Sequence, residues 1–286
     1  MGLKFKHPLG LAAGFDKSGA YVDELALLGF SFIEIGAVTP KPQKGNSKPR
    51  LFRLKKDKAL INRMGFNNPG MKIVAQNLKK RKSDVIVGVN IGKNTHTPNK
   101  KAKDDYLQVF TYLHPYADFF TVNVSCPNIG DIQSLSEKRN LVPLLKEMQE
   151  INRKSGKPKP ILLKLSPDLS EKQLNESIES ALEAQIDGLI VVNTTKDFSL
   201  LKSNYETLRK IGNGGLSGLP LKEKAKEITG YVSKQVKGKL VIIGVGGIMS
   251  PGDAKERMDA GADLIQIFTG LIYEGPGLIK KIIKAL

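Results

Sequence analysis

The single cysteine of the 286-residue chain, Cys126, lies in the stretch Asn-Val-Ser-Cys-Pro-Asn at positions 123–128. One cysteine cannot form an intramolecular disulfide, and none of the three histidines stands at ligand spacing to another or to Cys126, so we expect no metal site. The thiol is then either inert and buried or chemical. Because Cys126 follows an apolar run and precedes a proline, we expect a loop position. That position favours a thiolate acting as nucleophile or general base.

Polar residues follow several apolar runs, at the points where parallel strands would end. An unpaired lysine inside an apolar strand costs free energy, so Lys164 in Ile-Leu-Leu-Lys-Leu indicates a binding site. The carboxyl ends of barrel strands share one face, where we expect these side chains to converge. They predict a site for a planar, anionic, hydrogen-bonding ligand, and the set is Asp16, Lys17, Asn90, Lys93, Asn123, Ser125, Asn128, Lys164, Asn193, Thr194, Thr195 and Thr269.

Two glycine-rich turns follow the last two apolar runs, Gly-Val-Gly-Gly at 244–247 and Phe-Thr-Gly at 268–270. Backbone N–H groups at such strand-to-helix turns attract phosphate. Phosphate sites of (β/α)8 barrels commonly lie after strands 7 and 8. The turns therefore predict a phosphorylated cofactor, with Cys126 beside it.

Eight apolar runs alternate with eight amphipathic stretches, which predicts parallel strands buried on both faces and helices between them. The expected strands are 9–14, 32–36, 85–91, 119–124, 161–165, 188–193, 240–245 and 264–268. The expected helices are 18–29, 69–82, 101–115, 138–155, 170–185, 221–237, 250–260 and 275–286, with Ser170 and Ser250 as N-caps.

This alternation predicts a (β/α)8 TIM barrel in one domain spanning residues 1–286. A doubly wound open sheet is the alternative, because alternation alone does not show closure. Two connections, 37–68 and 194–220, are too long for tight barrel loops, and both follow strands. Long loops in compact domains are usually functional or disordered, so we expect these two at the site.

The net charge of +17, from 45 basic and 28 acidic residues, bears on solubility and association more than on fold. Such a charge can attract nucleic acid, anionic lipid or anionic metabolites, and the simplest interpretation is a lysine-rich solvated surface. The sequence holds no aromatic-interleaved basic motif, so we expect no nucleic-acid partner. No run reaches the roughly 20 apolar residues of a membrane span, and the N-terminus lacks a signal peptide. These features predict a soluble chain from a reducing compartment.

Long ordered motifs extend over essentially the whole chain. They are PLGLAAGFDKSG (8–19), IEIGAVTPKPQKGNSKPRLFRL (33–54), INRMGFNNPG (61–70), VNIGKN (89–94), VNVSCPN (122–128), LLKLSPDLS (162–170), VVNTT (191–195), GGLSGLPL (214–221) and IIGVGGI (242–248). With these motifs the chain resembles dihydroorotate dehydrogenase, an FMN-binding barrel enzyme. INRMGFNN and GNSKPRLFRL resemble the membrane-associated, quinone-reducing class 2 branch.

The resemblance implies oxidation of (S)-dihydroorotate to orotate in pyrimidine biosynthesis, with Cys126 as the general base. It implies FMN contacts at Ala13, Gly14, Lys17, Ala37, Asn90, Asn123, Lys164, Val192, Gly218, Gly247, Phe268 and Thr269. It implies dihydroorotate contacts at Lys17, Asn62, Arg63, Met64, Gly65, Phe66, Asn123, Asn128, Asn193 and Thr194.

The chain departs from the class 2 pattern at several places. The base is usually serine in class 2 and cysteine in class 1, so Cys126 is a class 1 base among class 2 motifs. Ile-Gly-Asp-Ile-Gln (129–133) replaces the usual lid sequence, and Ala37 stands where a threonine often contacts FMN. Class 2 members carry an N-terminal helical region that docks on the membrane and shapes the quinone tunnel, and from the resemblance we expect these 286 residues to lack it.

We therefore expect a monomer that contacts dihydroorotate, orotate and a quinone, peripheral to the cytoplasmic side of the cell membrane, where the positive charge suits anionic lipid. One alternative is another FMN-barrel reductase, such as one similar to tRNA-dihydrouridine synthase. The other is a non-catalytic phosphate-binding barrel, which would purify without flavin colour.

A Cys126→Ser substitution tests the expected base. A thiol has a far lower intrinsic pKa than a hydroxyl, so we expect the pH–rate profile of dihydroorotate oxidation to follow thiol ionisation and to move to higher pH in the variant. Steady-state rates measured across pH check this. An unchanged profile would exclude Cys126 as the base.

Overall fold

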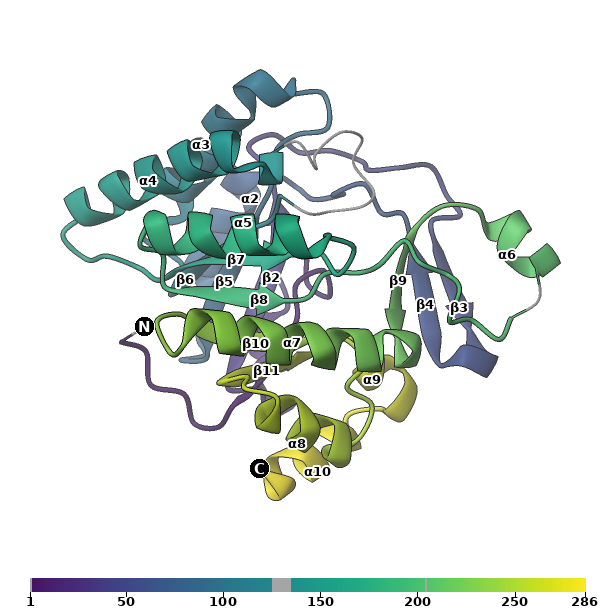
Figure 1. The fold of residues 1–286 in the computed structure, drawn as a ribbon. Coiled ribbons are helices and arrows are strands. Elements are labelled where there is room, and N and C mark those ends of the chain that lie inside the picture. The colour runs from purple at the N-terminus through teal and green to yellow at the C-terminus, as the bar shows by residue number, and fades with distance from the viewer. Residues whose placement is uncertain (1, 125–134, 204) are drawn as a thin grey trace.

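The computed structural model describes residues 2–124, 135–203 and 205–286. Eight parallel strands close into a barrel (Figure 1). In pairing order they are β1 (Leu9–Leu11), β2 (Phe32–Val38), β5 (Ile86–Ile91), β6 (Phe119–Val122), β7 (Ile161–Leu165), β8 (Gly188–Val191), β10 (Val241–Val245) and β11 (Leu264–Ile267), and β11 pairs with β1. The closed order confirms the predicted barrel and excludes the open doubly wound sheet.

Helices connect successive barrel strands and cover the outside of the barrel (Figure 1). They are α1 (Val22–Ala26), α2 (Met71–Lys80), α3 (Ala102–Leu113), α4 (Lys138–Lys154), α5 (Glu171–Glu183), α7 (Lys222–Val236) and α8 (Pro251–Asp259). Both predicted caps are present: Ser170 forms a capping box with Gln173, and the Ser250 hydroxyl accepts the Asp253 N–H at 3.2 Å. Among the described residues, no helix is long and apolar enough to cross a membrane.

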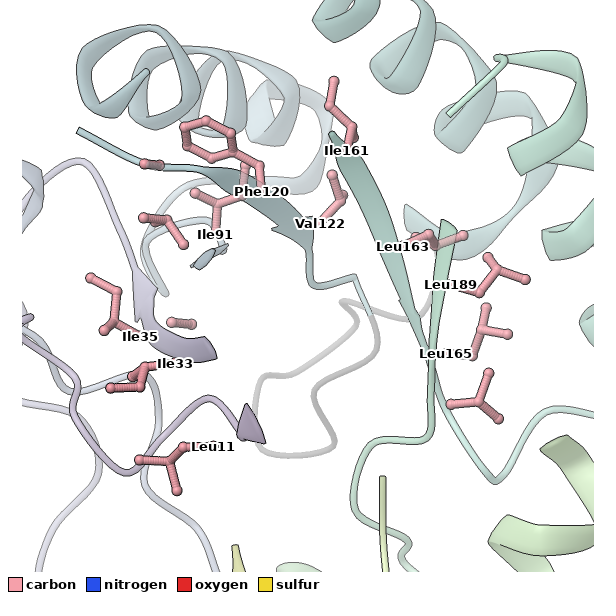
Figure 2. Packing of buried hydrophobic residues seen from close by; sticks show 14 of the residues in the cluster. Leu11, Ile33, Ile35, Ile91, Phe120, Val122, Ile161, Leu163, Leu165 and Leu189 are labelled. Carbon is pink, nitrogen blue, oxygen red and sulfur yellow. The ribbon is translucent and has the colours of Figure 1, made fainter. Parts of the chain in front are cut away.

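Side chains alternate between the two faces of the barrel strands, as the period of two requires. On β2, Ile33 and Ile35 belong to the large outer core beneath the helices, whereas Phe32 belongs to a separate inner cluster. Figure 2 shows outer-core side chains from β1, β2, β5, β6, β7 and β8. The inner cluster consists of Ala12, Phe32, Phe119, Leu162, Ile190, Ile243, Val245 and Leu264. We call this inner cluster the apolar floor.

The two long connections pair with each other, which the sequence did not predict. β3 (Leu51–Leu54), β4 (Ala59–Asn62) and β9 (Gly215–Gly218) form a three-stranded antiparallel sheet in the order β3-β4-β9. This sheet and α6 (Tyr205–Ile211) extend to one side of the barrel (Figure 1). They share a small apolar core formed by Leu54, Ala59, Ile61, Ile211 and Leu216.

The helix predicted over 275–286 is confirmed as α10 (Gly277–Ala285), and a short helix that was not predicted, α9 (Thr269–Glu274), precedes it. Gly275 has φ 74°, a conformation that ends a helix, and Pro276 cannot continue it. The extra helix begins directly after β11, beside the second glycine-rich turn.

Close packing of the apolar floor requires Gly88. A Cβ added there would lie 2.0 Å from Cζ of Phe119, its register partner on β6. We expect Gly88→Ala to lower the free energy of unfolding by about 1–3 kcal/mol through overpacking. Urea unfolding measures this.

The matched control is Gly230→Ala in α7, where the nearest atom to an added Cβ is 3.8 Å away. We expect that helix-interior substitution to stabilise the fold by up to about 1 kcal/mol. Equal unfolding free energies for Gly88→Ala and the unsubstituted chain would show that the floor is loosely packed.

Candidate active site

A cavity of about 210 Å³ opens at the carboxyl ends of the barrel strands. It extends over to the β3-β4-β9 sheet, which contributes Leu51, Leu60 and Ser217. The sequence-predicted residues that line it are Ala13, Gly14, Lys17, Ala37, Asn62, Met64, Gly65, Phe66, Asn90, Asn123, Lys164, Val192, Asn193, Thr194, Gly218, Gly247, Phe268 and Thr269. The fold thus brings both predicted sets, cofactor and substrate, to one place.

Arg63 is the described member of those sets that lies elsewhere. Its guanidinium stacks over the Phe52 ring at 4.6 Å from the centroid and donates to the backbone oxygens of Ile211 and, at 3.3 Å, Asn213. Its neighbours Asn62 and Met64 line the cavity. Successive side chains of an extended segment point to opposite sides, so Asn62 and Met64 can face the cavity while Arg63, between them, points away.

Three further predicted residues, Ser125, Cys126 and Asn128, lie outside the described residues, as does the expected lid at 129–133. Their predicted roles therefore stay predictions.

A layer of polar side chains lies directly above the apolar floor. Glu34, Asn90, Thr121, Lys164 and Gln266 each stand two positions after an inward-facing residue of the floor or after Gly88, so they also face the barrel interior. All five are buried, with Lys164 at 6% exposure and the other four at 0%. We call this set the polar layer. Asn90, Lys164 and Gln266 line the cavity, whereas Glu34 and Thr121 do not.

Hydrogen bonds join the polar layer to the amides above it. Asn123 Nδ2 donates to Asn90 Oδ1 at 3.0 Å, and Asn193 Nδ2 donates to Asn123 Oδ1 at 3.3 Å. The Thr194 N–H donates to Asn193 Oδ1 at 2.9 Å. Buried amides that are bonded in series are held in one orientation, which is what recognition of a small polar ligand requires.

Glu34 and Gln266 belong to this network and were missed from the sequence. Asn90 Nδ2 and Gln266 Nε2 each donate to the Glu34 carboxylate, both at 2.7 Å. The signal was present: each is a lone polar residue in an otherwise apolar strand, which is the argument that identified Lys164. The further lining residues that the sequence analysis did not name are Ala12, Leu51, Leu60, Ser217, Leu221, Ile248 and Ile267.

The loop after β1 carries Gly14 and Lys17 to the cavity. Asp16, which is buried, fixes this loop, because its Oδ1 accepts the N–H groups of Ser18 and Gly19 at 2.9 and 2.8 Å. Gly14 has φ 100°, a conformation that side chains other than hydrogen rarely allow. The sequence Gly-Phe-Asp-Lys is therefore a folded turn rather than a strand end.

The residues after β8 are held in a similar way. The Asp168 carboxylate accepts the Thr195 hydroxyl and, at 2.7 Å, the Lys196 N–H. It also pairs with Lys224 Nζ at 3.1 Å. This anchor lies directly after Asn193 and Thr194, so it restrains the two predicted substrate contacts.

The glycine-rich turn after β10 has no room for side chains. Gly247 has φ 73°, and a Cβ there would lie 2.3 Å from Lys222 Cα. Behind the turn, the buried Arg257 donates to the Gly246 carbonyl at 2.9 Å. Burial lowers the pKa of Arg257 to about 10, so it keeps its charge at neutral pH. Open backbone and a buried cation suit an anion at this turn.

The loop that carries Met64 to Phe66 depends on Asn68, which is 8% exposed. Its Oδ1 accepts the N–H groups of Thr39 and Gly70 at 3.2 and 2.9 Å. Its Nδ2 donates to Thr39 Oγ1 at 2.8 Å and to the Phe66 carbonyl at 2.7 Å. One amide therefore ties the cavity loop to the segment after β2.

An Asn68→Ala substitution removes these four bonds and leaves buried groups without partners. We expect the free energy of unfolding to fall by about 2–4 kcal/mol, since each unmatched buried group costs about 1–3 kcal/mol and some are reached by water. Thermal and urea unfolding measure the loss, with Asn213→Ala at an exposed position as the control. A loss no larger than that of the control would show that Asn68 does not hold the loop.

Comparison with known proteins places the chain in a family. The family model described as dihydroorotate dehydrogenase matches residues 1–286. A protein of Christiangramia forsetii named dihydroorotate dehydrogenase (quinone) is 50% identical over 281 residues, which are 98% of this chain and 81% of that protein. A protein of Roseiflexus with the same name is 48% identical and covers 100% of this chain and 78% of its own length.

The fold comparison agrees. The structure of DHODH from Eimeria tenella in complex with ferulenol matches with a TM-score of 0.91 and 35% identity, over 99% of this chain and 81% of that one. The ligand-free structure from the same organism matches with a TM-score of 0.92 and 36% identity, over 99% and 84% of the two chains. The resemblance predicted from the motifs is confirmed: the chain belongs to the dihydroorotate dehydrogenase family.

Proposed function

We propose that this chain oxidises (S)-dihydroorotate to orotate in de novo pyrimidine biosynthesis and passes the electrons to a quinone. One observation carries the proposal: several amide side chains and two lysines, Lys17 and Lys164, line the same cavity as the two glycine-rich turns. Dihydroorotate is a small ring with amide groups and a carboxylate, which such amides and a cation can bind. Family membership supports the same reaction.

FMN is the cofactor that we propose, and the residues present fit it. Among the described residues, Gln266 Oε1 is buried without a hydrogen-bond partner while its residue lines the cavity, so a bound group must supply a donor. At Gly218 and Gly247 a Cβ would clash with neighbouring backbone, so only glycine fits there and the main chain itself forms the cavity wall. When bound, FMN would supply the acceptor for the hydride of dihydroorotate.

We propose that Asn90, Lys164 and Gln266 of the polar layer meet the flavin ring. The backbone at Gly247 and the side chain of Thr269 would hold the phosphate. Ala13, Gly14, Ala37, Val192, Gly218 and Phe268 would form the remaining wall. Arg257 would act on the phosphate from behind the turn, through its charge and its bond to the Gly246 carbonyl.

On the substrate side, we propose that Lys17 binds the carboxylate of dihydroorotate and that Asn62, Asn123, Asn193 and Thr194 bind its amide groups. Met64, Gly65 and Phe66 would exclude water from one side of the cavity. Cys126 remains the proposed base that removes the proton from C5 of the substrate.

For the acceptor, we propose a quinone that reaches this monomer at an anionic membrane surface, on the cytoplasmic side. The net charge of +17 supports attraction to anionic lipid. Leu51, on β3, is 52% exposed and lines the cavity, so the cavity mouth carries an apolar side chain that suits a hydrophobic acceptor.

Anaerobic reduction tests the proposal. We would purify the protein, record its flavin absorbance and add dihydroorotate without oxygen. The expected result is a yellow protein whose visible band bleaches, because the bound flavin is reduced. A matched pair, Asn62→Ala at the cavity and Asn213→Ala at an exposed position, should weaken the response to dihydroorotate only in the first.

A yellow protein that stays yellow would contradict the proposed substrate. A colourless protein that takes up no FMN would instead favour a non-catalytic phosphate-binding barrel.

A further inference from the structure

Glu34 is a fully buried carboxylate to which the proposed reaction assigns no role. It lies within β2, at 0% exposure, and faces the barrel interior. A buried carboxylate is costly unless it is hydrogen-bonded, and Glu34 accepts two side-chain N–H bonds at 2.7 Å, from Asn90 and Gln266. Both donors line the cavity, so Glu34 sits directly behind two of its walls.

An ionised carboxylate accepts hydrogen bonds and donates none. Asn90 and Gln266 must therefore both turn their NH2 groups towards Glu34. The orientation is then passed on: Asn90 offers Oδ1 to Asn123 Nδ2 at 3.0 Å, and Asn123 offers Oδ1 to Asn193 Nδ2 at 3.3 Å. The Glu34 carboxylate thus determines, through Asn90 and Asn123, whether each amide in this series turns its oxygen or its NH2 group towards its next neighbour.

The same constraint acts on Gln266. With Nε2 bound to Glu34, its Oε1 is the atom left over, and this oxygen is buried without a hydrogen-bond partner among the described residues. By binding Nε2 of Gln266, Glu34 therefore orients Oε1 of Gln266 so that it can accept a hydrogen bond from an N–H or O–H of a bound group.

We propose that Glu34 is a positioning residue of the flavin site, which sets the hydrogen-bonding face of Asn90 and Gln266 and places a negative charge behind that face. The inference rests on the proposed FMN site. A fixed negative charge opposes the extra negative charge of reduced flavin, so Glu34 holds the midpoint potential of the bound flavin down.

Glu34→Gln tests the inference with little change of shape. A glutamine can keep the bond from Asn90 through its oxygen, and its NH2 can donate to Gln266 Oε1 if the Gln266 amide turns over. We therefore expect this variant to fold, with Gln266 presenting a donor to the cavity in place of an acceptor. The measurements are the Kd of oxidised FMN and the midpoint potential of the bound flavin.

We expect the Kd of oxidised FMN to rise about tenfold or more, and the potential to rise by about 30 mV, which is a tenfold change in relative affinity for the reduced form in a two-electron couple. The control is Thr121→Val, in the same layer but outside the cavity lining, where both values should stay unchanged. A role in stability alone would lower the unfolding temperature of Glu34→Gln and leave the potential unmoved.

Gln266→Met gives an independent readout, because it removes the acceptor but keeps the charge of Glu34. Its FMN affinity should fall about tenfold without a rise in potential. A potential and a Kd for Glu34→Gln equal to those of the unsubstituted protein would overturn the inference. If Glu34→Gln does not fold, an unchanged FMN affinity of Gln266→Met would overturn it. Failure of the unsubstituted protein to bind FMN would instead refute the proposed function.

Discussion

Closure of the eight parallel strands forces every second side chain of each strand into one enclosed interior, and the site depends on how that interior is filled. Towards the amino ends it is filled by apolar residues such as Phe32 and Phe119, for which Gly10 and Gly88 leave room. Two positions further along, five of the eight strands, β2, β5, β6, β7 and β11, supply polar residues instead. Along these strands, every second residue faces the interior, and these inward residues change from apolar to polar towards the carboxyl ends. Closure of the barrel brings the polar ones together, and they form the site.

Because the polar layer is buried, its polar groups need hydrogen-bond partners within the protein or from a bound group. Each of its charges and amides needs a partner, because an unmatched polar group in the interior costs more free energy than a matched one provides. Glu34 meets this demand with two donors, and the asparagines meet it in series. Gln266 Oε1 is an exception beside the cavity, and we interpret it as the place where a bound group completes the network. The same hydrogen bonds that orient the protein's amides therefore also determine which groups are presented to the proposed cofactor.

The barrel and part of the site could be predicted from the sequence because buried strands appear as apolar runs, in which a polar residue stands out. Every barrel strand was found from its apolar run, and Lys164 from a charge placed inside such a run. The β3-β4-β9 sheet was missed because its strands are short, and because the β3-β4 turn carries no glycine signal: Lys58 itself adopts the left-handed conformation, with φ 46°. β9 joins β4 from more than a hundred and forty residues away along the chain, and no local pattern reports such a pairing. The direction of the Arg63 side chain, towards Phe52 and the Ile211 carbonyl, could not be predicted because adjacency within a motif does not determine which way a side chain points.

The most direct measurement is a crystal structure of the protein with FMN and orotate. We expect the flavin ring to lie against Asn90, Lys164 and Gln266, with Gln266 Oε1 accepting a hydrogen bond from the bound cofactor. We expect the phosphate at Gly247 and orotate among Asn62, Asn123 and Asn193. A flavin bound away from the polar layer, or a Gln266 Oε1 still without a donor in the complex, would refute the proposed role of the polar layer.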